Sequence, residues 1–334
     1  MTKGIRQSNN SFAACLAIVG MLLLFSAALS GQETAPAAGS SVSTLMSRPP
    51  NVPEEYVITP FGYFHPSCVL SLAEGNTLLA NGGVQHADGT VEAAQVCNYP
   101  HYTRDGAMVA ADASESGKIP PEISGWLESV SATTSTSYYK ISATWTVPPS
   151  PTSNDGQCDY FFPGFEDSND VQSIVQPVLQ WGGGCYISGG AYWQLASWNC
   201  CMSGTTWHST PLDVNVGDNI LGTIAPTCKP GKNYCTTWNV VSEDKTTGKK
   251  TTLAKTPADG QIWNWAFGAV SEDYGIVQCS DFPDNSGLTF TVKLYDQNGK
   301  LITNPNWQGT QWNSGPPSCN YGWKITKTKE TVKY

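Results

Sequence analysis

Apolar and polar residues alternate along several stretches of the second half of the chain. In residues 139–147, apolar side chains occupy every second position, with lysine, serine and threonine between them. The same two-residue period recurs at 212–216 and 288–294, and the turn-forming pair Asn298-Gly299 follows the last stretch. This period is typical of β-strands with one apolar face, and no stretch of useful length shows a helical period.

A chain with this many strands favours two packed sheets over one. We therefore predict an all-β protein whose residues 119–334 form a double-sheet antiparallel β-sandwich, a concanavalin-like jelly roll. A small disulfide-clamped β-rich segment is expected before it, at 56–118, with hairpin turns at residues 82–83 and 88–89. Residues 112–118 lose apolar periodicity and are a candidate interdomain or cleavable linker.

The first residues of the chain have the composition of an export signal. A positively charged start precedes an apolar run at 12–24 and small residues at 27–31, which predicts a signal peptide over 1–31. The small, polar and proline-containing stretch at 32–55 is predicted to be a flexible linker. The apolar run is too short for a membrane span, so we expect a secreted protein without membrane association after cleavage.

The cysteine count favours disulfides over metal binding. Of the eleven cysteines, Cys15 leaves with the predicted signal peptide, and an even number in an exported chain predicts disulfide pairing. Proximity favours pairing Cys68 with Cys97 and Cys228 with Cys235, and the sequence leaves the other pairings open. No Cys-x-x-Cys pair is present, so we expect no metal and no other cofactor.

Charge argues against a nucleic-acid partner. The net charge is −9, and the only basic cluster, at 245–250, is interrupted by Thr-Thr-Gly and is better explained as a hairpin tip. Only 13% of the residues are charged, so acid leaves few carboxylates to protonate. We expect an extracellular monomer suited to acidic surroundings.

Two apolar, strand-like stretches each contain one chemically capable polar side chain. These are Gln176, within 173–178, and Glu272, within 268–274. A buried polar group needs a partner or a function, and this pair could polarise a carbonyl and activate a water. The common serine-hydrolase, zinc, phosphate-loop and dinucleotide motifs are absent. Catalysis would therefore depend on carboxylates, amides and hydroxyls.

Several motifs resemble those of the glutamic peptidases, the acid-active eqolisin family. Residues 125–148 resemble the family's entry strand, and 162–166 match its aromatic-x-Gly-x-acid turn. Ile-Val-Gln at 174–176 matches the motif of the catalytic glutamine, and 269–274 resembles the strand that ends in the catalytic glutamate. The resemblance covers roughly residues 125–291.

This resemblance implies a peptidase that acts on polypeptide substrates. Glu272 would be the general base, and Gln176 would orient the water and bind the developing oxyanion. Gln180 is the rival for the amide role. The residues expected to bind substrate are Gln180 itself, Phe162, Glu166 and Trp198. The family is made as zymogens, so residues 56–118 are a candidate propeptide that covers the groove.

The chain departs from the family pattern in two places. Phe162 stands where the family has tryptophan before the glycine turn. The family's Trp-x-Glu-Trp segment supplies a second carboxylate, whereas Gln194 or Ser197 stands at that position here. The supporting carboxylate is therefore absent or supplied by Glu166, which leaves open an altered specificity or an inactive relative.

Carbohydrate chemistry is the alternative. Nine of the twelve tryptophans could line a sugar-binding groove, although tryptophan is more often buried in a core. Glu166 and Glu272 would then be the acid pair of a glycoside hydrolase, or the sandwich would be a non-catalytic lectin. A purely structural role for Gln176 and Glu272 in a crowded sheet also remains open.

Overall fold

The computed structural model describes residues 48–110, 126–169, 173–187, 190–202, 204–232, 234–313, 315–316 and 318–334. The predicted signal peptide, most of the predicted linker at 32–55 and the boundary between 118 and 119 lie outside these residues. Within them, every regular element is a β-strand or a short 3-10 turn, at Pro66–Cys68 and Cys279–Asp281, which confirms the all-β class. None of the described helical turns has the length or apolarity to cross a bilayer.

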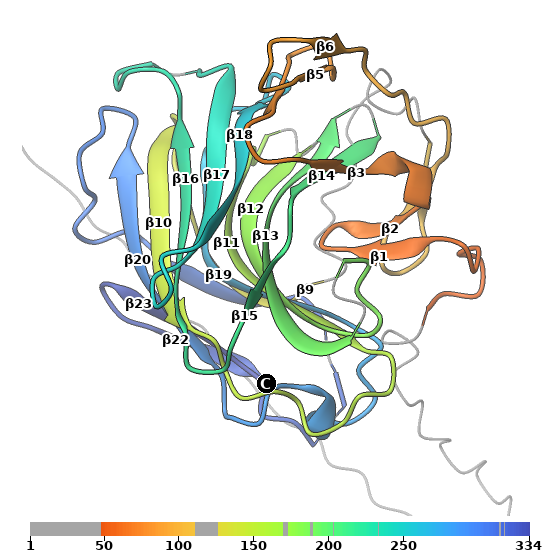
Figure 1. Ribbon diagram of the computed structural model, residues 1–334. Helices are drawn as coiled ribbons and strands as arrows, with labels where there is room; N and C mark the ends of the chain where they lie inside the picture. The colour runs from red at the N-terminus through yellow and green to blue at the C-terminus, as the bar shows by residue number, and fades with distance from the viewer. Residues whose placement is uncertain are drawn as a thin grey trace, which may run out of the picture. The chain divides into compact units, whose positions relative to one another are not determined.

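The first large sheet has seven antiparallel strands (Figure 1). Across the sheet their order is β18 (Lys250–Pro257), β17 (Thr237–Asp244), β16 (Asn219–Pro226), β10 (Tyr138–Thr146), β20 (Leu288–Asp296), β23 (Lys329–Lys333) and β22 (Gly322–Ile325). The strands predicted from the alternation at 139–147 and 288–294 are β10 and β20, and they pair with each other. β17 and β18 form the hairpin predicted around 245–250.

The second large sheet has nine strands. Their order is β21 (Gln308–Gln311), β9 (Trp126–Thr133), β19 (Trp265–Tyr274), β11 (Cys158–Glu166), β12 (Ile174–Gly182), β13 (Gly190–Met202), β14 (Thr205–Ser209) and β3 (Val69–Leu72), with β15 (Leu212–Val214) beside β13. β11 and β12 are buried at every residue. Burial of successive residues requires cover on both faces, because side chains along a strand point alternately to the two sides.

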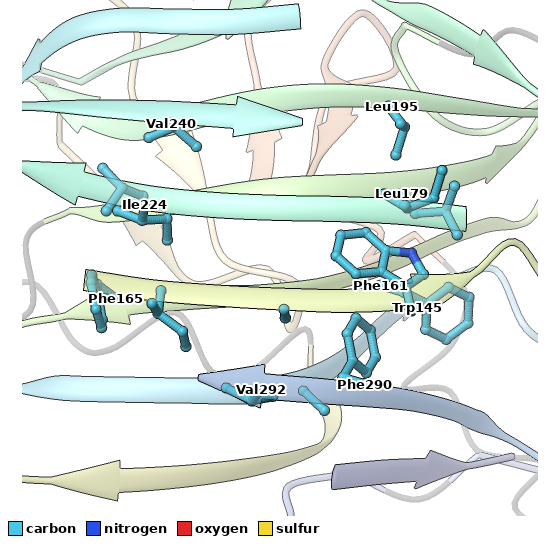
Figure 2. Close-up of a cluster of buried hydrophobic side chains, with 14 of the residues drawn as sticks. Trp145, Phe161, Phe165, Leu179, Leu195, Ile224, Val240, Phe290 and Val292 are labelled. Carbon is cyan, nitrogen blue, oxygen red and sulfur yellow. The ribbon is translucent and has the colours of Figure 1, made fainter. Parts of the chain in front are cut away.

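One face of the nine-stranded sheet packs against the seven-stranded sheet (Figure 2). Trp145 and Phe290 of the seven-stranded sheet meet with ring centroids 5.0 Å apart, and Phe161 and Leu179 of the nine-stranded sheet join the same apolar core. This arrangement confirms the predicted double-sheet sandwich. The odd-numbered residues of β11 and β12 face this core, so their even-numbered residues face the other way.

Residues 48–110, called here the N-terminal segment, pack on that opposite face, which we call the covered face. Phe61 and Phe64 of the segment share an apolar cluster with Phe162, Val178 and other residues of the nine-stranded sheet. β3 of the segment also pairs in parallel with β14 and so extends the sheet (Figure 1). The segment is therefore part of the same packed body as the sandwich.

The N-terminal segment contains two further small sheets. One has the order β1 (Val57–Thr59), β2 (Gly62–Phe64), β7 (His101–Tyr102) and β8 (Met108–Val109), and the other has β4 (Thr77–Leu78), β5 (Val84–Gln85) and β6 (Val91–Glu92). The turns of the second sheet contain Gly82 and Gly89, both at positive φ, as the sequence predicts.

The last residues of the predicted flexible linker, 32–55, belong to this packed segment. Val52 is 4% exposed and lies in the apolar cluster of the covered face. Arg48 donates hydrogen bonds to the carbonyls of Pro53 at 3.0 Å and Tyr56 at 2.7 Å. One apolar anchor and two backbone contacts order a stretch whose composition is that of a linker.

The predicted disulfide between Cys68 and Cys97 is confirmed. Two further disulfides join Cys158 to Cys185 and Cys279 to Cys319. Cys200 is also disulfide-bonded. These bonds support the prediction that the chain folds in an oxidising compartment.

The predicted pairing of Cys228 with Cys235 is wrong, because both are free thiols. The Cys235 sulfur instead accepts a hydrogen bond from the Cys228 amide at 3.2 Å and donates one to the carbonyl of Thr237 at 3.4 Å. The two residues do lie close together, but the Cys235 sulfur forms hydrogen bonds with backbone groups and no disulfide.

Candidate functional site

The site residues predicted from the sequence lie on the covered face, in rows that run across β19, β11 and β12. The register places Glu272 opposite Tyr160, and Tyr160 opposite Gln180. Between β19 and β11 the rows continue with Val270–Phe162, Phe267–Gly164 and Trp265–Glu166. The β11–β12 register, fixed by Phe161–Leu179 and Phe165–Val175, extends these three rows to Val178, Gln176 and Ile174. All the predicted polar groups therefore share one buried face, which is the first condition for a joint site.

Gln176 already holds a peptide carbonyl. Its side chain has no solvent exposure, and its Nε2 donates a hydrogen bond to the carbonyl oxygen of Pro60 at 2.7 Å. Pro60 lies at the tip of the β1–β2 hairpin of the N-terminal segment. Gly164, in the same row, has no side chain, and Trp198 of β13 pairs with Gln176 on its other side. The amide is thus an N–H donor directed at backbone that enters from outside the sandwich.

Glu272 is fully buried and is bonded to a neighbour on its own strand. The Tyr274 hydroxyl donates to Glu272 Oε1 at 2.6 Å, and the two-residue spacing places both side chains on the covered face. Burial raises the pKa of Glu272 to about 8, against the lowering effects of the Tyr274 hydrogen bond and the Arg104 charge. In this covered state the carboxyl is therefore neutral at acidic pH.

The register separates Gln176 from Glu272 more than it separates Gln180 from Glu272. In a flat sheet with strands about 4.8 Å apart and about 3.3 Å per residue, the Cα atoms of Gln176 and Glu272 would be roughly 16 Å apart. For Gln180 and Glu272 the same geometry gives about 10 Å. Within the described residues, no hydrogen bond joins Glu272 to either amide. For the role of the amide that acts with Glu272, the row position therefore favours Gln180, whereas the hydrogen bond to a peptide carbonyl favours Gln176.

Glu166 is a second buried carboxyl on the covered face. Its pKa is raised to about 8, chiefly by burial and secondarily by the charge of Glu272. Its carboxylate oxygens make no hydrogen bond with any described residue. A carboxyl in this environment can hold a proton at neutral pH, which is a property of general acids.

The remaining predicted site residues form apolar walls or stand unpaired. Phe162 and Trp198 are both 0% exposed. Phe162 packs edge-on against Trp126, with centroids 5.8 Å apart, and Trp198 packs against His208 at 4.9 Å. The side-chain amide of Gln180 has no partner among the described residues.

The positions where the family has its extra glutamate do not supply a carboxyl here. Gln194 donates from Nε2 to Asp213 Oδ1 at 2.7 Å. The Ser197 hydroxyl lies 3.0 Å from that of Ser242, on the seven-stranded sheet. Glu166 is thus the additional carboxyl on the covered face, three rows from Glu272.

Three residues near the site were not predicted. Tyr274 bonds Glu272, Tyr160 lies between Glu272 and Gln180, and the Arg104 side chain stands over the Tyr274 ring at 5.4 Å from its centroid. The two-residue spacing from Glu272 to Tyr274 on a predicted strand was a usable signal. Nothing in the sequence around Arg104 pointed to a site more than 160 residues away.

The tryptophans do not form the open groove that the carbohydrate hypothesis requires. Of the nine proposed for it, six lie in the core between the two large sheets: Trp145, Trp181, Trp193, Trp207, Trp263 and Trp307. Trp198 is buried on the covered face, and Trp265 and Trp312 are partly buried there. Their placement supports the expectation that most of these residues are core.

No cluster of three or more His, Cys, Asp or Glu side chains that could hold a metal ion occurs in the described part of the chain.

The comparisons with known proteins show a distant likeness of fold. No family model matches the sequence, and no curated protein matches it. A crystal structure of Scytalido-glutamic peptidase with a peptide-based transition state analog is 15% identical, with a TM-score of 0.45, and covers 63% of this chain and 98% of its own. SCP-B, described as a member of the eqolisin family in a complex with the tripeptide Ala-Ile-His, is 15% identical, with a TM-score of 0.44. The match covers 63% of this chain and 98% of SCP-B.

A toad ovary galectin in complex with thio-digalactose is also similar, at 9% identity and a TM-score of 0.26, covering 49% of this chain and 98% of its own. Peptidase and lectin structures thus both resemble this sandwich at low identity. The choice between functions depends on the residues of the covered face.

Proposed function

We propose that this protein is a secreted acid endopeptidase that hydrolyses peptide bonds with Gln176 and Glu272. The observation that supports this function best is the hydrogen bond from Gln176 Nε2 to the peptide carbonyl of Pro60, at 2.7 Å. An amide donor that holds a carbonyl, on the face that also carries a buried glutamate, supports an oxyanion-binding role for Gln176. The function needs no metal and no cofactor.

In the proposed reaction, ionised Glu272 takes a proton from water as the water oxygen bonds to the substrate carbonyl carbon. The negative charge that develops on the carbonyl oxygen is stabilised by the Gln176 N–H. Glu272 then returns its proton to the amide nitrogen, the C–N bond breaks, and a carboxylic acid and an amine leave. Glu272 ends in the state in which it began.

The N-terminal segment would keep this site latent, as a propeptide does. It buries Glu272, and burial raises the pKa of that carboxyl to about 8, so the group is protonated in acid and cannot act as a base. Removal of the segment would hydrate the carboxyl and lower its pKa toward the ordinary value near 4.5. Glu272 would then ionise at mildly acidic pH.

A digest of denatured casein from pH 2 to 7, with an aspartic-peptidase inhibitor present, tests the function. We expect Glu272→Gln to abolish cleavage and Gln176→Ala to reduce it by about 10²–10³, the usual loss of one oxyanion donor. Gln180→Ala, which removes the rival amide, is the matched comparison and should lose less activity than Gln176→Ala. Full cleavage by both Glu272→Gln and Gln176→Ala would overturn the proposal, and the reverse ranking of the two glutamines would move the amide role to Gln180.

A glycoside hydrolase is the second candidate, and one observation favours it. Glu166 and Glu272 are both buried carboxyls whose pKa burial raises to about 8, and glycoside hydrolysis uses a carboxyl that stays protonated together with one that is ionised. Release of reducing sugar from glycans, lost in both Glu166→Gln and Glu272→Gln but kept in Gln176→Ala, would establish it. Binding to glycan columns without hydrolysis would instead indicate a lectin.

A further inference from the structure

β1 of the N-terminal segment and the turn that follows it make backbone contacts with the sandwich at Ile58 and Pro60. The carbonyl of Ile58 accepts hydrogen bonds from the Tyr186 amide at 3.2 Å and from the Tyr160 hydroxyl at 3.1 Å. Two residues on, the carbonyl of Pro60 accepts from Gln176 Nε2. Pro60 is the first residue of the turn after β1, so the three donors hold one continuous stretch of main chain that runs from the middle of β1 into the turn.

The donor beside Ile58 belongs to a fixed piece of backbone. Ile58 forms a parallel β-bridge with Cys185, which a disulfide ties to Cys158 at the start of β11. Strand addition of this kind binds a peptide through its main chain and leaves its side chains to confer specificity. Tyr186 N–H, Tyr160 Oη and Gln176 Nε2 together form what we call the backbone cradle.

The residue after the held carbonyl enters an apolar site. Phe61 is 2% exposed and belongs to the apolar cluster that includes Phe162, Trp198 and Phe267. The ring of Tyr63 lies edge-on to that of Tyr274, with centroids 5.6 Å apart, and so covers the partner of Glu272. The segment thus fills the space on both sides of the held carbonyl.

We propose that residues 58–61 occupy the backbone cradle as a substrate would, so that the cradle binds extended polypeptides and favours a large aromatic residue directly after the bond to be cut. This inference rests on the proposed peptidase function, because that function identifies the carbonyl at Gln176 as the reacting one. Tyr160 is then a substrate-binding residue, and the β1–β2 turn is the inhibitor.

The geometry of the turn explains why the bound segment is not consumed. β1 and β2 pair on either side of Pro60-Phe61, with Thr59 opposite Gly62, and the Thr59 hydroxyl donates to the Gly62 carbonyl at 3.0 Å. The chain therefore reverses immediately after the held carbonyl, and the paired strands would keep the two ends together after a cut. In addition, Glu272 Oε1 accepts a hydrogen bond from the Tyr274 hydroxyl.

The test compares full-length wild type with Phe61→Ala, and with Val91→Ala, a change at an exposed site of the same segment, as the control. We expect Phe61→Ala to cleave a fluorogenic peptide in acid at least about tenfold faster than wild type, without a lag. Val91→Ala should behave as wild type. Gly62→Ala is a second release variant, because a Cβ there would lie 2.4 Å from the Tyr102 carbonyl oxygen and φ is +111°.

Two measurements on the Phe61→Ala protein then examine the cradle itself. Peptides with Phe after the scissile bond should be cut at least about tenfold better than those with Ala. Adding Tyr160→Phe should raise KM roughly fivefold with kcat little changed, the loss expected for one neutral hydrogen bond. A fall in kcat at unchanged KM, or no preference for Phe, would overturn the assignment.

Amide hydrogen exchange at Tyr186 separates this inference from the proposed function. The Tyr186 N–H should be protected in wild type, exchange faster in Phe61→Ala, and regain protection when a synthetic peptide of residues 56–64 is added. Regained protection without any peptide cleavage would uphold the cradle and refute the peptidase. Cleavage with no response at Tyr186 would uphold the peptidase and refute the cradle.

Discussion

Glu330 provides a test of the buried-carboxyl chemistry away from the proposed site. It lies on β23 of the seven-stranded sheet, is 0% exposed, and its carboxyl oxygens have no partner among the described residues. Its Cγ packs close to Gly268, where a Cβ would lie 3.3 Å away. Burial raises the pKa of Glu330 to about 8 from an ordinary value of 4.5. Replacement by glutamine keeps the shape and removes the titration.

The direction of the stability change with pH follows from the raised pKa of Glu330 in the folded state. Between pH 4.5 and 8 the folded protein holds a proton on Glu330 that the unfolded chain has released, so stability is complete below 4.5 and falls as pH rises. At pH 7 the difference covers 2.5 pH units, which at about 1.4 kcal/mol per unit is roughly 3 kcal/mol. Glu330→Gln should recover this amount at pH 7 and leave stability at pH 4 little changed.

Thermal unfolding of wild type and Glu330→Gln at pH 4 and pH 7 measures the effect. At roughly 2–4 °C per kcal/mol for a domain of this size, the variant should gain about 6–12 °C over wild type at pH 7. Asp284→Asn, at an exposed position, is the control and should show the wild-type pH dependence. The same pH dependence in Glu330→Gln as in wild type would refute the reasoning.

Three further outcomes are expected. Glu166→Gln should leave casein cleavage within about tenfold of the parent, because the carboxyl lies three rows from Glu272; abolition would favour the glycoside-hydrolase pair. Alkylation of the unreduced, denatured protein, read by mass spectrometry, should label Cys228 and Cys235, and no label on them would restore the pairing that the sequence favoured. Replacing both cysteines of the Cys158–Cys185 disulfide by alanine should lower the free energy of unfolding by roughly 3–4 kcal/mol in a urea titration, and an unchanged midpoint would refute this.

The sandwich could be predicted because its strands carry local signals. Alternation at 139–147 and 288–294 marks β10 and β20, each with one face on the core. β11 and β12 carry near-continuous apolar runs because both of their faces are covered, and the isolated Gln176 in such a run was therefore conspicuous.

The arrangement of the candidate site could not be predicted from these signals. Sequence periodicity gives the face of a residue but not its register against other strands, so the alignment of Glu272 with Gln180 became visible only in the structure. The contact of Gln176 with Pro60 joins residues 116 positions apart, and the parallel pairing of β3 with β14 has no local signature. The resemblance implied a propeptide that covers the groove, but not that Pro60 would be the residue held by Gln176.

The most direct test of the central claim is to release the N-terminal segment and incubate the protein with denatured casein in acid. Mass spectrometry then detects any new peptide termini. Wild type and Glu272→Gln, treated alike, should differ completely: new termini accumulate with wild type and are absent with the variant, whose amide cannot accept the proton of the attacking water. Equal accumulation of the same termini with both proteins would contradict the assignment of Glu272 as the base, and with it the proposed peptidase site.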